Sequence, residues 1–127
     1  MTRAVGRLAG AAICTTVFSA IVTWPQIAHL GDAIVPHHDV HFSMWRLGWI
    51  AHALTTHPTG LFNANIFYPA RQALAFSEAN IGAGVIAIPA WGFSGNPYLA
   101  HNSVVLFAFA MGVAGAYYLV RYLTGSR

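Results

Sequence analysis

Two long uncharged apolar runs dominate the hydrophobic pattern of the chain. The first covers residues 8–30, and the second covers residues 98–120 and ends against Arg121. At about 1.5 Å per residue, each run is long enough to cross a hydrocarbon core of about 30 Å as an α-helix. The pattern therefore predicts transmembrane helices over residues 8–30 and 98–121. A cleaved signal peptide is the rival interpretation of the first run, but that run continues through Trp24 without a clean small-residue cleavage site.

Two shorter patterns lie between these runs. Residues 39–56 place Phe42, Trp45 and Trp49 at steps of three and four, which is the spacing of a helix lying on its apolar face. Residues 80–93 form an apolar run that is broken by a proline and is too short to cross a bilayer. Because tryptophan and tyrosine prefer the membrane–water interface, we expect an interfacial helix over 39–56. Over 80–93 we expect a short apolar helix that is interfacial or re-entrant.

The composition is typical of a membrane protein. Of the 127 residues, 57% are hydrophobic and 7% are charged, whereas a soluble domain carries about 25% charged residues. The formal net charge of +3 comes from scattered arginines that form no basic stripe, so we expect no nucleic-acid partner. The single cysteine, Cys14, lies in an apolar run and indicates neither a disulfide framework nor a thiolate metal site.

The distribution of arginines predicts how the chain is oriented in the membrane. Cytoplasmic segments carry an excess of arginine and lysine. Four arginines lie near the ends of the chain: Arg3, Arg7, Arg121 and Arg127. Two crossings place all four in the cytoplasm, whereas three crossings would place the last pair outside. The predicted fold is therefore an all-α membrane protein with cytoplasmic ends at residues 1–7 and 122–127, and with an extracytoplasmic segment at residues 31–97 between its two transmembrane helices.

Small residues recur on one side of the second predicted span. Gly112 and Gly115, together with Ala108 and Ala116, lie at helical spacing. Membrane helices approach one another closely through such residues. We therefore expect further transmembrane helices, in addition to membrane lipids, as partners of the chain.

The three carboxylates of the chain all fall in the segment predicted to be extracytoplasmic. They are Asp32, Asp39 and Glu78. In the predicted helix, Asp39, Ser43 and Arg46 follow one another at steps of four and three, so they share one stripe. A carboxylate there can act as a general base on a hydroxyl, and an arginine can bind a phosphate oxygen. The alternative role for Asp39 is a helix N-cap, in which its oxygen accepts a free backbone N–H.

Three histidines lie around the start of the same predicted helix. His37, His38 and His41 carry imidazole nitrogens that suit zinc. Their spacing is weak evidence for a metal site, because the adjacent pair converges only in an irregular turn. They nevertheless support a different interpretation of the chain, as a small non-enzymatic membrane protein whose histidine-rich loop binds a metal or a protein partner.

Three motifs occur in order along the chain. An acidic residue precedes W-x-x-x-W-x-x-H-A-L at residues 45–54, N-x-F-Y-P occupies residues 65–69, and R-x-L-T-G occupies residues 121–125. With these motifs, nearly the whole chain resembles the N-terminal part of a large group of bacterial polytopic proteins. That group is assigned to the GT-C glycosyltransferase superfamily, whose members use polyprenyl-phosphate sugars.

The resemblance implies a multi-pass enzyme of the bacterial inner membrane. Such an enzyme transfers a sugar from a polyprenyl-phosphate donor to an extracytoplasmic acceptor with inversion, and its catalytic aspartate near the start of the first loop maps onto Asp39 as the general base. The family shows Gly-Asp at that point, whereas this chain has that pair at Gly31-Asp32, so Asp32 is a second candidate. Glu78 matches a position that tends to be acidic, where it would help to bind a divalent metal or to orient the acceptor.

The departing lipid phosphate of this implied reaction needs a positive charge or a metal nearby. Arg46 and Arg71 are the only arginines of the predicted extracytoplasmic segment, so they are the candidates for the donor phosphate. Family members carry many more spans after the R-x-L-T-G motif, and those spans build most of the donor-lipid groove. We therefore expect the chain to be an N-terminal fragment that is inactive alone and assembles with further helices of the same protein.

Overall fold

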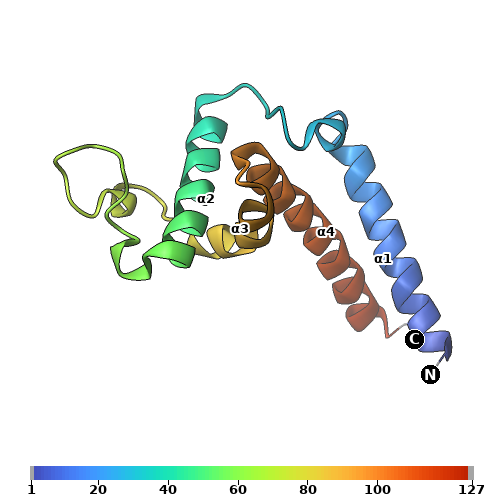
Figure 1. Ribbon diagram of the computed structural model, residues 1–127. Helices are drawn as coiled ribbons and strands as arrows, with labels where there is room; N and C mark the ends of the chain where they lie inside the picture. Colours follow the sequence, from blue (N-terminus) through green and yellow to red (C-terminus); the bar gives the residue numbers. More distant parts are fainter. Residues whose placement is uncertain (1, 126–127) are drawn as a thin grey trace. The chain divides into compact units, whose positions relative to one another are not determined.

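The computed structural model describes residues 2–125, and for residues 2–5 and 7–9 it describes only the backbone. The elements are the α-helices α1 (Thr2–Val22), α2 (His38–Thr56), α3 (Ile81–Ser94) and α4 (Pro97–Thr124), and the short 3₁₀ helices η1 (Gln26–His29), η2 (Pro58–Gly60) and η3 (Ala73–Phe76). No strand occurs in this part of the chain (Figure 1), so the all-α prediction is confirmed. The cytoplasmic placement predicted for Met1, Ser126 and Arg127 concerns residues outside the described range.

The chain divides into two compact units. The two-helix unit contains residues 1–28 and 105–127, and the central unit contains residues 29–104. Helix α4 therefore begins in the central unit and continues in the two-helix unit. The central unit holds every residue that the sequence singles out as a site candidate.

Helix α4 is the one helix among the described residues that is long and apolar enough to cross a membrane. Its apolar side chains in the two-helix unit are largely exposed, as Leu119, Val120 and Leu123 illustrate. A Cβ built on Gly112 or Gly115 would meet no atom within 4 Å, so no described segment packs against the predicted small-residue side. Length and composition thus make α4 a candidate transmembrane helix.

Helix α1 is shorter than the span predicted over residues 8–30. It ends at Val22, well before residue 30, and its described part is not among the helices long and apolar enough to cross a membrane. The cause is Pro25, which lacks a backbone N–H and disfavours a helical conformation at the residue before it. The rest of the apolar run forms a turn and η1. The two-span topology therefore stays a prediction.

Helix α2 is the centre of the central unit. One side of it packs in a cluster with the loop that follows, and this cluster contains Ile50, Ala53, Leu61, Ala64, Ala73 and Leu74. Another side packs against α3 and the first turns of α4 in a second cluster, which contains Leu47, Ala51, Ala87 and Ala100. A helix with apolar residues on two sides is stabilised by burying both of them.

The contact between α2 and α3 depends on a glycine in each helix. A Cβ built on Gly48 of α2 would lie 3.0 Å from the ring of Trp91, and a Cβ built on Gly84 of α3 would overlap Ile50. Because neither glycine carries a side chain, the bulky neighbour of each occupies the space. The close approach of the two helices fixes α2 within the unit.

Helices occur within one residue of the ranges predicted at 39–56 and 80–93. The apolar side of α2, however, is partly covered by protein. Trp45 and Trp49 are partly buried against the cluster around Ile50, which is itself fully buried. The spacing that indicated a helix thus corresponds in part to packing inside the unit, because the loop and α3 remove part of this apolar surface from water. The interfacial placement of the helix stays a prediction.

Candidate functional site

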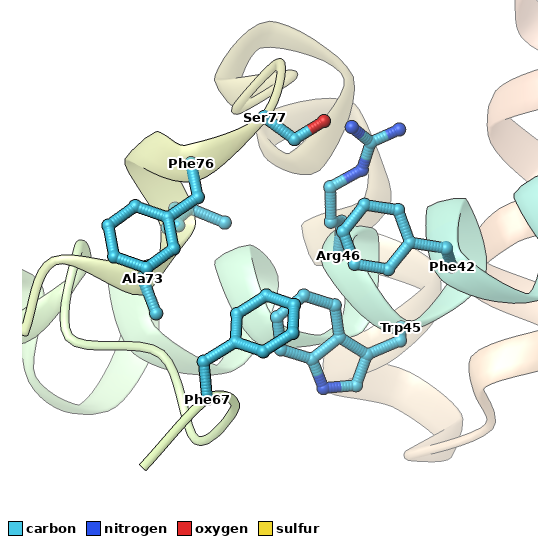
Figure 2. Close-up of a pocket in the computed structure, with 8 residues that line it drawn as sticks. Phe42, Trp45, Arg46, Phe67, Ala73, Phe76 and Ser77 are labelled. Carbon is cyan, nitrogen blue, oxygen red and sulfur yellow. The ribbon is translucent and has the colours of Figure 1, made fainter. Parts of the chain in front are cut away.

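An aromatic pocket of about 400 Å³ lies beside α2 in the central unit (Figure 2). The residues that line it are Phe42, Trp45 and Arg46 of α2, and Phe67, Ala73, Leu74, Phe76 and Ser77 of the loop that follows α2. Figure 2 shows Phe67 and Phe76 on the loop wall, with Trp45, Arg46 and Phe42 on the helix wall. Apart from Arg46 and Ser77, the lining residues are apolar, so the pocket suits an aliphatic chain or the apolar face of a ring.

Aromatic pairs build both walls. The rings of Phe42 and Trp45 stack with their centroids 5.5 Å apart, and those of Phe67 and Phe76 stack at 6.1 Å. Helical spacing places Phe42 and Trp45 on adjacent turns of α2. The indole N–H of Trp45 donates to Oδ1 of Asn65 at 3.2 Å, which ties the helix wall to the loop.

Arg46 is the only cation of the aromatic pocket. Its side chain is 7% exposed, and its Nη1 donates to the backbone carbonyl of Glu78 at 2.6 Å while Nη2 donates to Oγ of Ser43 at 3.0 Å. The guanidinium carbon lies 4.8 Å from the centroid of the Phe42 ring, in cation–π range. Of the predicted stripe of Asp39, Ser43 and Arg46, the last two are thus in direct contact, and Asp39 is not part of that contact.

One donor of Arg46 is left over. Its Nε is buried and has no hydrogen-bond partner in the described chain. A buried donor without a partner destabilises a protein by about 1–3 kcal/mol, so an acceptor oxygen brought to it would be favourable. The pocket itself combines an apolar lining with the positive charge of Arg46, which suits a ligand that has an apolar part and an anionic group.

Asp39 lies in the first turn of α2, and its side chain is 91% exposed. The predicted alternative role as N-cap is wrong, because His37 occupies that position and its Nδ1 accepts the backbone N–H of Asp39 at 3.2 Å. Oδ2 of Asp39 also lies 3.5 Å from Nδ1 of His37, but a ring nitrogen that accepts the backbone N–H carries no proton to share with the carboxylate. Asp39 precedes Phe42 by three residues, which places the free carboxylate one helical turn from the wall of the aromatic pocket.

The second aspartate lies apart from this arrangement. Asp32 follows η1, and its Oδ2 lies 3.2 Å from Nδ1 of His29. Its side chain is 72% exposed and does not line the aromatic pocket. Within residues 2–125, no contact joins Asp32 to Asp39 or Arg46, so the two candidate bases belong to different surroundings.

The structure joins Glu78 to Arg46 but leaves Arg71 elsewhere. The Glu78 carboxylate lies 3.5 Å from Nη1 of Arg46 and is 84% exposed, so its ionic contact is screened by water and weak. The short bond from Arg46 goes to the Glu78 main chain. Arg71 is exposed and is not among the residues that line the pocket.

The three histidines are not gathered into a metal site. Among the described residues there is no group of three or more histidine, cysteine, aspartate or glutamate side chains that could hold a metal ion. His37 caps α2, and Nδ1 of His41 lies 2.9 Å from the backbone oxygen of His37. The rings of His37 and His38 are tilted, with their centroids 6.4 Å apart.

Two asparagines that the sequence analysis passed over organise the unit. Asn96 caps the start of α4, since its Oδ1 accepts the N–H groups of Tyr98 and Leu99, and its Nδ2 donates to the carbonyl of Gly31 at 2.8 Å. Asn102 is fully buried and donates to the carbonyls of Leu30 and Ala33. The pair Asn96-Pro97 is a recognisable helix start, whereas no local pattern points to Asn102.

Comparison with family models, with curated proteins and with solved structures finds no match for this chain. Its function therefore has to be argued from its own residues.

Proposed function

We propose that the chain is the N-terminal module of an integral-membrane glycosyltransferase of the GT-C type. The enzyme would transfer a sugar from a polyprenyl-phosphate donor to an acceptor hydroxyl outside the cytoplasm, with Asp39 as the general base. The observation that carries this proposal is the placement of the free Asp39 carboxylate one helical turn from a pocket that combines aromatic walls with a buried arginine. The motif resemblance described above gives the reaction class.

The site has two parts: Asp39 suits the acceptor, and the aromatic pocket with Arg46 suits the lipid phosphate that leaves. Asp39 would take the proton of the acceptor hydroxyl, whose oxygen attacks the anomeric carbon as the bond to the lipid phosphate breaks. The departing phosphate is an anion, and the guanidinium of Arg46, which lines the pocket, would offer it a positive charge. The apolar lining of the aromatic pocket suits the first isoprene units that adjoin this phosphate.

The proposed topology follows from charge and hydropathy. Helix α4 is a candidate span, and we propose α1 with the adjoining apolar residues as the second. The arginines at both ends would then face the cytoplasm of a bacterium, and the central unit would lie on the outer side of its inner membrane. The exposed apolar surface of α4 would contact lipid and further helices of the same protein.

The test replaces Asp39 by asparagine in the complete membrane protein, with Asp32→Asn as the matched control. Sugar transfer from a labelled polyprenyl-phosphate donor is measured in membranes that contain equal amounts of each variant. We expect Asp39→Asn to lower transfer by about 10²–10⁴-fold, the range typical of a lost general base, and Asp32→Asn to retain it. Transfer by Asp39→Asn at the level of the unmodified protein would remove Asp39 from the mechanism.

A further inference from the structure

The loop between α2 and α3 has an outward surface that is rich in aromatic side chains. We call Phe62, Phe67, Tyr68, Arg71 and Phe76 the loop patch. The exposed fractions of its four aromatic residues are 42% for Phe62, 57% for Phe67, 98% for Tyr68 and 61% for Phe76. In Figure 1 this loop extends beyond α2. Phe67 and Phe76 stack on each other and also line the aromatic pocket, whereas Phe62 and Tyr68 do not line it. Exposed aromatic side chains concentrated in one short loop indicate a contact.

The exposure does not come from a loosely attached loop. The backbone N–H of Leu74 donates to the carbonyl of Phe62 at 3.1 Å, and the backbone N–H of Gln72 donates to Oδ1 of Asn63 at 3.0 Å. Leu74 is also buried in the cluster around α2, so the inner side of the loop is fixed. The outer side chains are therefore presented by a folded segment.

The backbone of the patch stores strain. Phe67 has a φ of 59°, a left-handed conformation that is rare for a bulky side chain. Such a conformation is unfavourable and persists where the surrounding structure enforces it, commonly at a functional contact. The surrounding structure thus holds the backbone in the conformation that exposes the aromatic side chains at and next to Phe67.

Charge and chemistry identify the partner. Arg71 is the only aspartate, glutamate, lysine or arginine between residues 58 and 77, so the patch presents one positive charge amid aromatic rings. Tyrosine and phenylalanine beside arginine suit the headgroup layer of a bilayer, where rings meet the acyl boundary and the guanidinium meets phosphate. The same chain carries α4, a helix long and apolar enough to cross a membrane, so a bilayer is a partner that the chain itself suggests.

We propose that the loop patch rests on the headgroup layer of an anionic bilayer. Tyr68 and Phe62 enter among the headgroups, and Arg71 pairs with lipid phosphate. This surface lies on the loop after α2 and is distinct from the apolar side of α2 that the sequence suggested. The proposal requires the chain to be membrane-bound but requires no sugar transfer, so it can hold whether or not Asp39 is a base.

The test uses the full chain with Cys14→Ala, reconstituted in vesicles of phosphatidylcholine with or without phosphatidylglycerol. A single cysteine replaces Tyr68 and is labelled with an environment-sensitive fluorophore. The matched control is Thr59→Cys, at the exposed start of the same loop and outside the patch. We expect the label at position 68 to be quenched by spin-labelled lipids and protected from iodide, and the label at 59 to show the reverse. A Phe62→Cys variant repeats the test if the first variant does not insert.

An Arg71→Gln variant tests the contribution of the positive charge to membrane binding. Loss of one arginine near an anionic surface should weaken the bound state of the loop about fivefold in vesicles with phosphatidylglycerol, from roughly 1 kcal/mol per charge, and have little effect in pure phosphatidylcholine. Equal iodide quenching at positions 68 and 59 would overturn the proposal. Protection of position 68 from both quenchers would also overturn it, in favour of a protein cover over the patch.

Discussion

Gly84 of α3 faces Ile50 of α2 so closely that a Cβ built on the glycine would lie 2.6 Å from the Cβ of Ile50. Ile50 is fully buried, so its side chain has no room to withdraw. This contact sets the separation between α3 and the helix that carries Asp39 and Arg46. The position of the candidate site therefore depends on Gly84 having no side chain.

Gly84→Ala should destabilise the central unit. Overpacking a filled core costs about 1–3 kcal/mol, and the helix propensity of alanine offsets only part of it. The free energy of unfolding is measured by circular dichroism of the full chain in detergent with added denaturant. Gly82→Ala is the matched control, because a Cβ there meets no atom within 4 Å. Equal behaviour of the two variants would show that α2 and α3 do not pack as described.

Arg46→Met should lower the stability of the central unit more than Glu78→Gln does. Methionine keeps much of the buried volume of the arginine but loses its bonds to the Glu78 carbonyl and to Ser43, and hydrogen bonds that involve a charged group contribute about 1.5–3 kcal/mol each. Glutamine at position 78 retains the carbonyl and removes only a screened ionic contact, for which about 0–1 kcal/mol is typical. The readout is the rate of proteolysis within residues 57–80. Faster cleavage in Glu78→Gln would mean that the carboxylate, and not the main chain, holds Arg46.

Asn102→Ala should loosen the segment between η1 and α2. The Asn102 amide donates to the carbonyls of Leu30 at 2.9 Å and Ala33 at 2.8 Å, and both would lose this buried partner. Leaving a buried group unsatisfied costs about 1–3 kcal/mol. Hydrogen exchange over residues 29–37 would report the loss as faster exchange. Ser103→Ala is the neighbouring control, because the Ser103 hydroxyl makes no hydrogen bond within residues 2–125, and a similar increase in that variant would contradict the role of Asn102.

The sequence was most informative where the pattern is local. Steps of three and four placed a helix at 39–56, and the structure has it at His38–Thr56. The same spacing put Ser43 and Arg46 on one stripe, and their side chains do form a hydrogen bond. What the spacing left open was the partner of the apolar side, because a bilayer and a protein core remove the same surface from water.

Contacts between distant residues escaped the sequence analysis. Arg46 and Glu78 are 32 positions apart, and the loop that brings them together has neither helical nor alternating periodicity. The loop wall of the aromatic pocket, with Phe67 and Phe76, was hidden for the same reason. The N-cap was the alternative role for Asp39 because aspartate is a favoured cap, yet the ring nitrogen of His37 two residues earlier accepts the free backbone N–H.

Substitutions at His37 test directly whether His37 or Asp39 is the N-cap of α2. His37→Ala removes the acceptor for the Asp39 N–H and should lower the free energy of unfolding by about 0.5–2 kcal/mol, the range for a lost N-cap. His37→Asn supplies a favoured cap oxygen and should restore the stability, which excludes a general effect of removing the ring. Asp39→Ala should cost only about 0.3–1 kcal/mol, because an exposed carboxylate in the first turn acts on the helix dipole alone. Denaturant unfolding measures the free energy of unfolding of the three variants. A larger loss of stability in Asp39→Ala than in His37→Ala would show that Asp39 is the N-cap. It would also weaken the case that the Asp39 carboxylate is free to accept a proton.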